Sequence, residues 1–297
     1  MSKEKVVLEE KKPMMTAKEE ISNYTGKAQK ALTLFEDYTQ EQVDHIVHEM
    51  ALAAMEQHMP LAKMAVEETG RGVYEDKCIK NMYAAENIWH SIRKNKTVGI
   101  IEDNKVDQIM KVAAPVGVVA GIIPTTNPTS TTIFKAMICM KTRNPIIFSF
   151  HPSAEKCSAA TAKVVYDAAI KAGAPADCIQ WVEGVSMEKT AELINHPEVA
   201  VVLATGGAAM VKAAYSTGKP ALGVGPGNVP AYIEKTANIK RAVNDIIVSK
   251  TFDNGMICAS EQAAIVDSEI YDEVKKEFQL HNVYFAKPEE IQQLEDV

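Results

Sequence analysis

The alternation of short apolar runs with amphipathic stretches, which begins at Val116, constrains the fold more than any other feature of this chain. Residues 116–123 form an apolar run of the kind found in a strand buried on both faces of a parallel sheet. Such strands alternating with helices predict an α/β fold, a doubly wound parallel sheet with helices on both faces. We expect strands at residues 116–123, 146–150, 178–181, 199–203 and 231–233, and helices at residues 131–141, 153–171, 187–195 and 208–216.

The residues before this region predict a helical lead and a hairpin. Residues 1–15 are charged, and we expect them to be disordered. A threonine followed three residues later by glutamate or glutamine is a capping box, which marks the start of a helix. Residues 97–113 then predict two strands around the polar turn Glu102-Asp103-Asn104. The capping boxes are Thr16 with Glu19 and Thr39 with Gln42, and further helices are expected over residues 60–70 and 74–92.

The composition is that of a globular protein without a general affinity for nucleic acid or membranes. The chain of 297 residues is 46% hydrophobic and 24% charged, and its net charge is −7. Its longest apolar run is too short to span a bilayer. The five cysteines are irregularly spaced and form no Cys-x-x-Cys pair. They predict free thiols in a reducing cytoplasm and no metal centre.

Four polar segments that contain glycine or proline follow the expected strands. Ligands of open parallel sheets bind beyond the carboxyl ends of the strands, so four such segments in succession predict a mononucleotide or dinucleotide site. The spacing Gly223-x-Gly225-x-Gly227 differs from the Gly-x-Gly-x-x-Gly fingerprint, which does not support an ordinary phosphate loop. The segments are residues 124–128, 151–154, 205–207 and 223–228, and we expect the last to be a loop.

Cys258 lies in a stretch with the composition of a turn that exposes a reactive thiol. Gly255 and Ala259 are small, while Asn254 and Ser260 add polar groups beside the sulfur. One more strand (263–266) and one helix (268–278) are expected after it. We predict that Cys258 is a nucleophile, that the other four cysteines are buried, and that Glu261 is structural.

The chain resembles the N-terminal part of CoA-acylating aldehyde dehydrogenases, of the kind fused to an alcohol dehydrogenase in bacterial bifunctional enzymes. The resemblance extends from about residue 20 to the end and is carried by residues 120–128, 148–154, 204–207 and 252–261. It implies an aldehyde dehydrogenase-like fold whose Rossmann-type NAD domain, with the helical lead and the hairpin arm 97–113, occupies residues 16–255. Residues 256–297 would begin a catalytic domain that is incomplete, so a truncated chain is expected.

The resemblance also implies residue roles. Cys258 matches the nucleophile whose thiolate attacks an aldehyde, and Asn127 matches the amide that forms an oxyanion hole with the Cys258 backbone N–H. Hydride transfer to NAD then leaves a thioester on Cys258. The positions that match those lining NAD are Ile122, Ile123, Pro124, Thr125, Thr126, Asn127, His151, Gly207 and Gly225.

One departure from the wider family bears on the acyl acceptor. Hydrolytic aldehyde dehydrogenases carry a glutamate that activates water, whereas the matching stretch here begins Ala221-Leu222-Gly223 and has no carboxylate. A thiol can still attack the thioester, which favours CoA as co-substrate and acyl-CoA as product, with acetaldehyde and acetyl-CoA as the first expectation. His151 replaces a lysine of hydrolytic relatives and does not favour NADP.

Two other functions stay open from the sequence. A reductase of acyl phosphates, such as glutamyl phosphate reductase, also uses a cysteine and a nicotinamide cofactor. A non-catalytic fragment that binds NAD or assembles with a longer homologue is the second alternative. In the family the hairpin arm makes oligomer contacts, so a homo-oligomer is expected of the intact protein.

Overall fold

The computed structural model describes residues 15–296, and the chain divides by its contacts into two compact units. The sheet unit comprises the described residues up to Gly70 together with Lys77–Gly225. The Cys258 unit comprises Arg71–Asp76 and the described residues from Pro226 onward. The expected disordered segment 1–15 lies, except for residue 15, outside the described residues. The functional boundary expected at residue 256 stays a prediction.

The sheet unit contains a five-stranded, all-parallel sheet in the order β5-β4-β3-β6-β7. The chain winds outward from β3 to β5, then returns to the other side of β3 for β6 and β7. This is the doubly wound arrangement that the sequence predicted. The strands are β3 (Val118–Ile122), β4 (Ile146–Ser149), β5 (Ile179–Trp181), β6 (Val199–Thr205) and β7 (Ala221–Val224).

Helices bury apolar side chains against both faces of this sheet. On β3, Val119 belongs to a core cluster with α2, α6 and α7, whereas Val118 and Ala120 belong to a second cluster with α1, α8 and α9. Alternate side chains of a strand point to opposite faces, which explains this division. The helices before residue 226 are α1 (Ala17–Phe35), α2 (Gln40–Glu56), α3 (His58–Thr69), α4 (Tyr74–Met82), α5 (Ile88–Ile92), α6 (Pro128–Lys141), α7 (Glu155–Lys171), α8 (Met187–Asn195) and α9 (Ala208–Tyr215). The first residues of α4, up to Asp76, belong to the Cys258 unit.

The helix ends follow the local signals in the sequence. Both predicted capping boxes form, Thr16 with Glu19 at the start of α1 and Thr39 with Gln42 at the start of α2. The left-handed residue Gly70 ends α3. The helix expected over residues 74–92 is interrupted by a π-helical turn, Tyr83–Asn87, which has no simple sequence signature.

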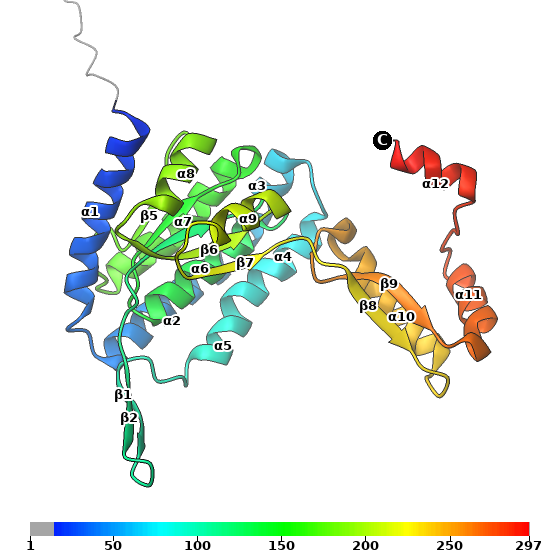
Figure 1. Ribbon diagram of the computed structural model, residues 1–297, viewed down its shortest axis with the longest axis horizontal. Helices are drawn as coiled ribbons and strands as arrows, with labels where there is room; N and C mark the ends of the chain where they lie inside the picture. Colours follow the sequence, from blue (N-terminus) through cyan, green and yellow to red (C-terminus); the bar gives the residue numbers. More distant parts are fainter. Residues whose placement is uncertain (1–14, 297) are drawn as a thin grey trace, which may run out of the picture. The chain divides into compact units, whose positions relative to one another are not determined.

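The predicted hairpin forms, but its turn lies further along the chain than expected. Strands β1 (Gly99–Asn104) and β2 (Ile109–Ala113) pair antiparallel and extend away from the sheet (Figure 1). The polar residues 102–104 therefore lie in β1, not in the turn. The Asn104 Oδ1 accepts the backbone N–H groups of Val106 and Asp107, and this local bonding sets the turn at residues 105–108.

The segment 223–228, expected to be a loop, instead begins inside the edge strand β7. Gly223 faces α9 so closely that a Cβ on it would lie 2.7 Å from both Tyr215 Cε2 and Val211 Cγ1. The glycine therefore permits close packing of strand against helix rather than a turn. The predicted strand 231–233 forms within β8 (Val229–Ile233) but does not join the main sheet.

In the Cys258 unit, β8 pairs parallel with β9 (Glu261–Val266), and α10 (Ile239–Thr251) connects the two strands. Ile233 and Val243 of this β-α-β crossover form a small core with Val274, which lies on the following helix. The unit continues through α11 (Tyr271–Leu280) and α12 (Pro288–Glu295). None of the helices within residues 15–296 is long and apolar enough to cross a membrane.

Candidate functional site

Loops that follow four parallel strands meet at the carboxyl edge of the main sheet. Ile122 pairs in register with Ser149 of β4 and Ala204 of β6, while Thr205 pairs with Val224 of β7. The structure thus brings the predicted cofactor residues to one edge. Ile122 ends β3 and is followed by Ile123, Pro124, Thr125, Thr126 and Asn127, while His151 follows β4, Gly207 follows β6 and Gly225 follows β7.

The switch point of the sheet lies between β3 and β6, and a buried lysine joins the two strands there. The Nζ of Lys135 on α6 donates to the carbonyl oxygens of Ile122 and Leu203, both at 2.7 Å. Lys135 is 4% exposed, and burial lowers its pKa to about 7. Sequence reasoning missed this residue. Its signal was a lysine inside the otherwise apolar stretch 133–140 of a helix.

Asn127 occupies the N-cap position of α6, yet its side chain does not cap that helix. Asparagine is favoured at this position because its side-chain oxygen accepts a hydrogen bond from the first turn. Here Oδ1 instead accepts from the Nζ of Lys80 at 2.7 Å, and Nδ2 donates to Thr126 Oγ1 at 3.1 Å. The amide is therefore held by other side chains and leaves the helix uncapped.

Two further polar side chains lie at the same edge. The Oγ1 of Thr125 is buried and has no hydrogen-bond partner among the described residues. A buried hydroxyl without a partner is costly, so its site fits a ligand that supplies one. His151 is exposed, and its Nδ1 accepts the backbone N–H of Ser153 at 3.1 Å. In the neutral ring this bond leaves Nε2 as the donor.

The ends of β6 and β7 present backbone without side chains. The N–H of Gly206 donates to the carbonyl oxygen of Val224 at 3.1 Å, which joins the two strand ends. A Cβ on Gly225 would make an ordinary contact with Val211 Cγ2 at 3.6 Å, and one on Gly207 would meet nothing within 4 Å. An extended ligand could therefore approach the main chain of Gly207 and Gly225 closely.

Cys258 is exposed, whereas the other four cysteines are buried. The prediction that these four are buried is confirmed. Burial raises the pKa of Cys139, Cys157 and Cys178 to about 12, which keeps these thiols protonated near neutral pH. Cys258 is therefore the thiol of this chain that a solute reaches.

The turn before Cys258 has an unusual backbone. Asp253, Asn254 and Gly255 have φ angles of 52°, 53° and 72°, so three successive residues adopt the left-handed conformation. Such residues usually occur singly, since each non-glycine residue costs about 1–2 kcal/mol. Asp253 is buried; its Oδ1 accepts the N–H of Val73 at 2.7 Å, and its own N–H donates to Asp76 Oδ2 at 2.7 Å.

Glu261, the first residue of β9, carries a carboxylate oxygen, Oε2, that is buried without a hydrogen-bond partner among the described residues. The backbone of this residue pairs with Val229 of β8. The strand position fits the prediction that Glu261 is structural, but the buried oxygen has no structural account.

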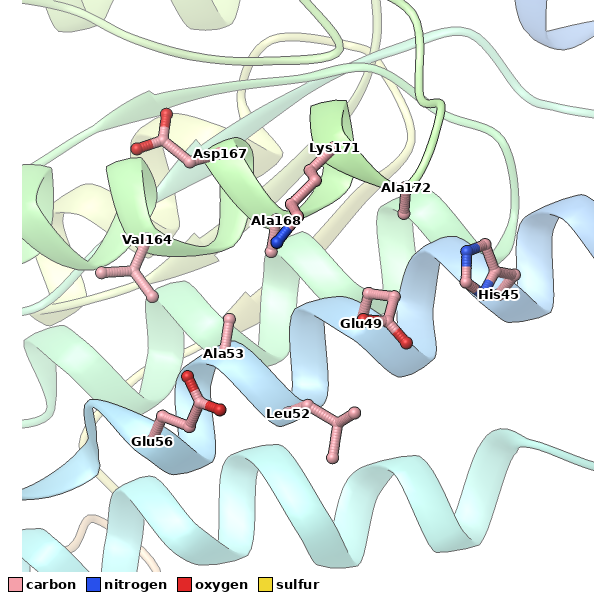
Figure 2. Close-up of a pocket in the computed structure, with 10 residues that line it drawn as sticks. All are labelled: His45, Glu49, Leu52, Ala53, Glu56, Val164, Asp167, Ala168, Lys171 and Ala172. Atoms are coloured by element: carbon pink, nitrogen blue, oxygen red, sulfur yellow. The ribbon is translucent and has the colours of Figure 1, made fainter.

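The sheet unit also contains a cavity of about 490 Å³ between α2 and α7 (Figure 2). Its polar lining includes Glu49, Glu56, Asp167 and Lys171. None of the predicted site residues lines it, so it is separate from the carboxyl edge of the sheet. Within residues 15–296, no group of three or more His, Cys, Asp and Glu side chains is arranged to hold a metal ion.

Comparison with known proteins gives consistent matches. A model of the aldehyde dehydrogenase family matches residues 10–283. Aldehyde-alcohol dehydrogenase 2 of Entamoeba histolytica is 60% identical over 283 residues, which cover 95% of this chain and 32% of that protein. An acetylating aldehyde dehydrogenase from Geobacillus thermoglucosidasius matches with a TM-score of 0.88 and 52% identity, covering 93% of this chain and 61% of that chain.

A propionaldehyde dehydrogenase from Rhodopseudomonas palustris, solved with bound CoA and an acylated cysteine, matches with a TM-score of 0.80 and 32% identity. This match covers 93% of the present chain and 63% of the other. The chain thus spans about a third of the length of the Entamoeba relative. Because the family model covers most of its residues, the chain belongs to the aldehyde dehydrogenase family.

Proposed function

We propose that this chain carries the NAD-binding and nucleophile-bearing parts of a CoA-acylating aldehyde dehydrogenase. The reaction interconverts a short aldehyde, CoA and NAD with acyl-CoA and NADH, and acetaldehyde is the first candidate substrate. The observation that carries the proposal is the exposed Cys258 thiol, which follows the restrained turn 253–255, in a chain whose other four cysteines are buried. The names of the acetylating and aldehyde-alcohol relatives give independent support.

The carboxyl edge of the main sheet is the proposed NAD site. NAD supplies the hydride acceptor when it is bound. The buried Thr125 hydroxyl without a partner, and the accessible backbone at Gly207 and Gly225, support binding there. His151, whose Nε2 is left as a donor by the bond to Ser153, would bind a ribose hydroxyl.

In the forward direction the Cys258 thiolate attacks the aldehyde carbonyl carbon and forms a C–S bond, which gives a thiohemiacetal with a negative oxygen. The Nδ2 of Asn127 and the Cys258 backbone N–H are the proposed donors to this oxygen. One such donor contributes roughly 3–4 kcal/mol in comparable enzymes. Loss of the aldehyde hydrogen as hydride then leaves an S-acyl thioester on Cys258.

CoA is the proposed acceptor of this acyl group. The thiolate of CoA attacks the thioester carbonyl, the C–S bond to Cys258 breaks, and the Cys258 thiolate is restored. The proposal rests on Ala221, which stands where hydrolytic relatives carry the water-activating glutamate. Without a general base for water, the thiol is the better nucleophile.

Assembly and compartment are part of the same proposal. The hairpin exposes apolar side chains, including Ile100, Ile109, Met110 and Val112. Exposed apolar patches mark contact surfaces, so we propose that the hairpin contributes to a homo-oligomer of the intact protein. A reducing cytoplasm, which keeps five thiols free, is the proposed compartment.

Acyl transfer to Cys258 tests the function without requiring the complete reaction. The purified chain is mixed with acetyl-CoA, and S-acetylation is located by mass spectrometry of proteolytic peptides. We expect acetylation at Cys258, none in Cys258→Ser, and NADH oxidation if the chain turns over. Acetylation of Cys258 by acetyl phosphate but not by acetyl-CoA would instead favour an acyl-phosphate reductase. No acetylation from either donor would favour a non-catalytic fragment.

A further inference from the structure

One face of helix α4 holds the loop that carries Asn127. The Nζ of Lys77 donates to the Thr126 carbonyl oxygen at 3.1 Å, and the Nζ of Lys80 donates to Asn127 Oδ1 at 2.7 Å. One residue further on, Asn81 Oδ1 accepts the Thr129 hydroxyl at 2.7 Å. Positions three and four residues apart in a helix lie on the same face, so these contacts form one continuous support.

Lys80 determines which end of the Asn127 amide faces away from the helix. An ammonium group has three donors and no acceptor, so it can form a hydrogen bond only with the oxygen of the amide. With Oδ1 bound to Lys80, the amide presents Nδ2. One Nδ2 hydrogen is directed to Thr126 Oγ1. The second has no partner among the described residues and is available to a ligand.

We propose that Lys80 is a positioning residue that fixes the Asn127 amide as a hydrogen-bond donor to the reaction oxyanion. This inference rests on the proposed function, in which Asn127 Nδ2 stabilises the negative oxygen. Rotation of the amide by half a turn would place Oδ1 toward that oxygen and replace attraction with repulsion. The charge-assisted bond to Lys80 excludes this orientation before substrate arrives.

A purely structural role for Lys80 predicts different behaviour. If the lysine only anchored the loop, its loss would lower stability and would affect acyl transfer in the Asn127→Ala background as well. A positioning role acts through Asn127, so the two substitutions should not be additive. It also allows rescue by arginine, which likewise has donors and no acceptor.

The test compares Lys80→Met, Lys80→Arg, Asn127→Ala and the double variant Lys80→Met/Asn127→Ala. Lys63→Met is the control, because the Lys63 side chain is 69% exposed and pairs only with Glu67 on its own helix among the contacts described. The first readout is the rate of acetyl transfer from acetyl-CoA to Cys258, which passes through the same kind of oxyanion. The second is the side-chain amide signal of Asn127 in the NMR spectrum of chain labelled with ¹⁵N-asparagine, assigned by its loss in Asn127→Ala.

We expect Asn127→Ala to slow acetyl transfer about 100-fold, the effect of removing one oxyanion donor. Lys80→Met should slow it about 10-fold, the scale of one charge-assisted hydrogen bond, and shift the Asn127 amide signal. Lys80→Arg should recover most of the rate, and the double variant should be no slower than Asn127→Ala. Lys63→Met should match the unsubstituted chain.

Two outcomes separate failure of the inference from failure of the proposed function. If Asn127→Ala slows transfer but Lys80→Met changes neither the rate nor the amide signal, the role of Lys80 is overturned and that of Asn127 stands. If Asn127→Ala leaves the rate unchanged, or no variant is acetylated at all, the oxyanion role of Asn127 is overturned and the inference falls with it.

Discussion

The backbone of Gly227 lies against the carbonyl oxygen of Cys258, so closely that a Cβ on Gly227 would be 3.0 Å from that oxygen. Both residues precede a strand of the parallel pair, Gly227 before β8 and Cys258 before β9. The proposed nucleophile therefore lies at the amino ends of these strands, unlike the proposed cofactor residues at the carboxyl edge of the main sheet. Its position depends on a neighbour that has no side chain.

Gly227→Ala should move the Cys258 main chain by a few tenths of an ångström and slow acetyl transfer to the thiol about five-fold. A misplacement of 1 Å can cost about 100-fold, so a smaller shift has a proportionately smaller effect. The measurement is the rate of Cys258 acetylation by acetyl-CoA. Gly26→Ala on α1 is the control, because a Cβ there meets nothing within 4 Å. Equal rates in all three proteins would contradict the prediction.

Asp253→Ala should loosen the turn before Cys258, the proposed nucleophile. The substitution leaves the Val73 N–H without its carboxylate acceptor, which costs about 1–3 kcal/mol, and places alanine in a left-handed conformation. We expect amide hydrogen exchange in residues 251–258 to accelerate by at least ten-fold, measured by mass spectrometry.

Asp253→Asn is the matched control for this turn. Asparagine keeps an Oδ1 acceptor for Val73 and tolerates the left-handed conformation. Its exchange should lie close to that of the unsubstituted chain. Similar acceleration in both variants would mean that the charge of Asp253, rather than the hydrogen bond, holds the turn.

Gly223→Ala should destabilise the sheet unit by about 1–3 kcal/mol, since the added methyl would overlap Tyr215 and Val211 on α9. Both tryptophans, Trp89 and Trp181, lie in this unit, so their fluorescence during urea unfolding reports on it alone. Gly225→Ala is the control, because its Cβ would make an ordinary contact at 3.6 Å. Equal stability of the two variants would refute the packing role of Gly223.

Local and periodic features of the fold were predictable from the sequence. A capping box depends on residues three apart, and Thr16 caps α1 as its sequence neighbours predict. The alternation of strands and helices depends on short apolar runs, and Val119 in one such run is buried in the sheet core. The strand-end loops with Asn127 and His151 follow from the same alternation. The expectation of a loop at Gly223 was wrong, because glycine is required there by close packing against a helix and not by a turn.

What the sequence did not reveal depends on contacts between distant residues. The bond from Lys80 to Asn127 joins positions 47 residues apart, and a lysine on a helix gives no indication of its partner. The pairing of β8 with β9, in place of the main sheet, likewise depends on contacts between segments about 30 residues apart in the chain. The left-handed turn at Asp253 was predictable only in part. Asn254 and Gly255 favour the left-handed conformation, whereas Asp253 is held in it by hydrogen bonds to residues distant in the sequence.

Lys135 gives the sheet unit a pH-dependent stability whose sign follows from its lowered pKa. In the unfolded chain a lysine keeps its proton up to a pKa near 10.5, whereas burial lowers the folded value to about 7. Between these values the unfolded state binds one more proton than the folded state, so the free energy of unfolding rises with pH. The buried thiols act in the opposite sense, but only above about pH 9, where the unfolded cysteines lose protons that the folded ones keep.

Between pH 7 and pH 8.5 the Lys135 contribution alone should raise the free energy of unfolding by about 1.5 kcal/mol. Lys135→Met keeps the length of the side chain and removes the titrating group, so its unfolding free energy should lack this rise, whatever constant change comes from losing the bonds to Ile122 and Leu203. The measurement is urea unfolding followed by tryptophan fluorescence at several pH values in this window, in both proteins. The other groups that titrate in this window contribute equally to both proteins, so the difference between the two slopes of unfolding free energy against pH isolates Lys135. Parallel slopes would show that Lys135 stays charged in the folded sheet unit, held by the two strand carbonyls despite its burial.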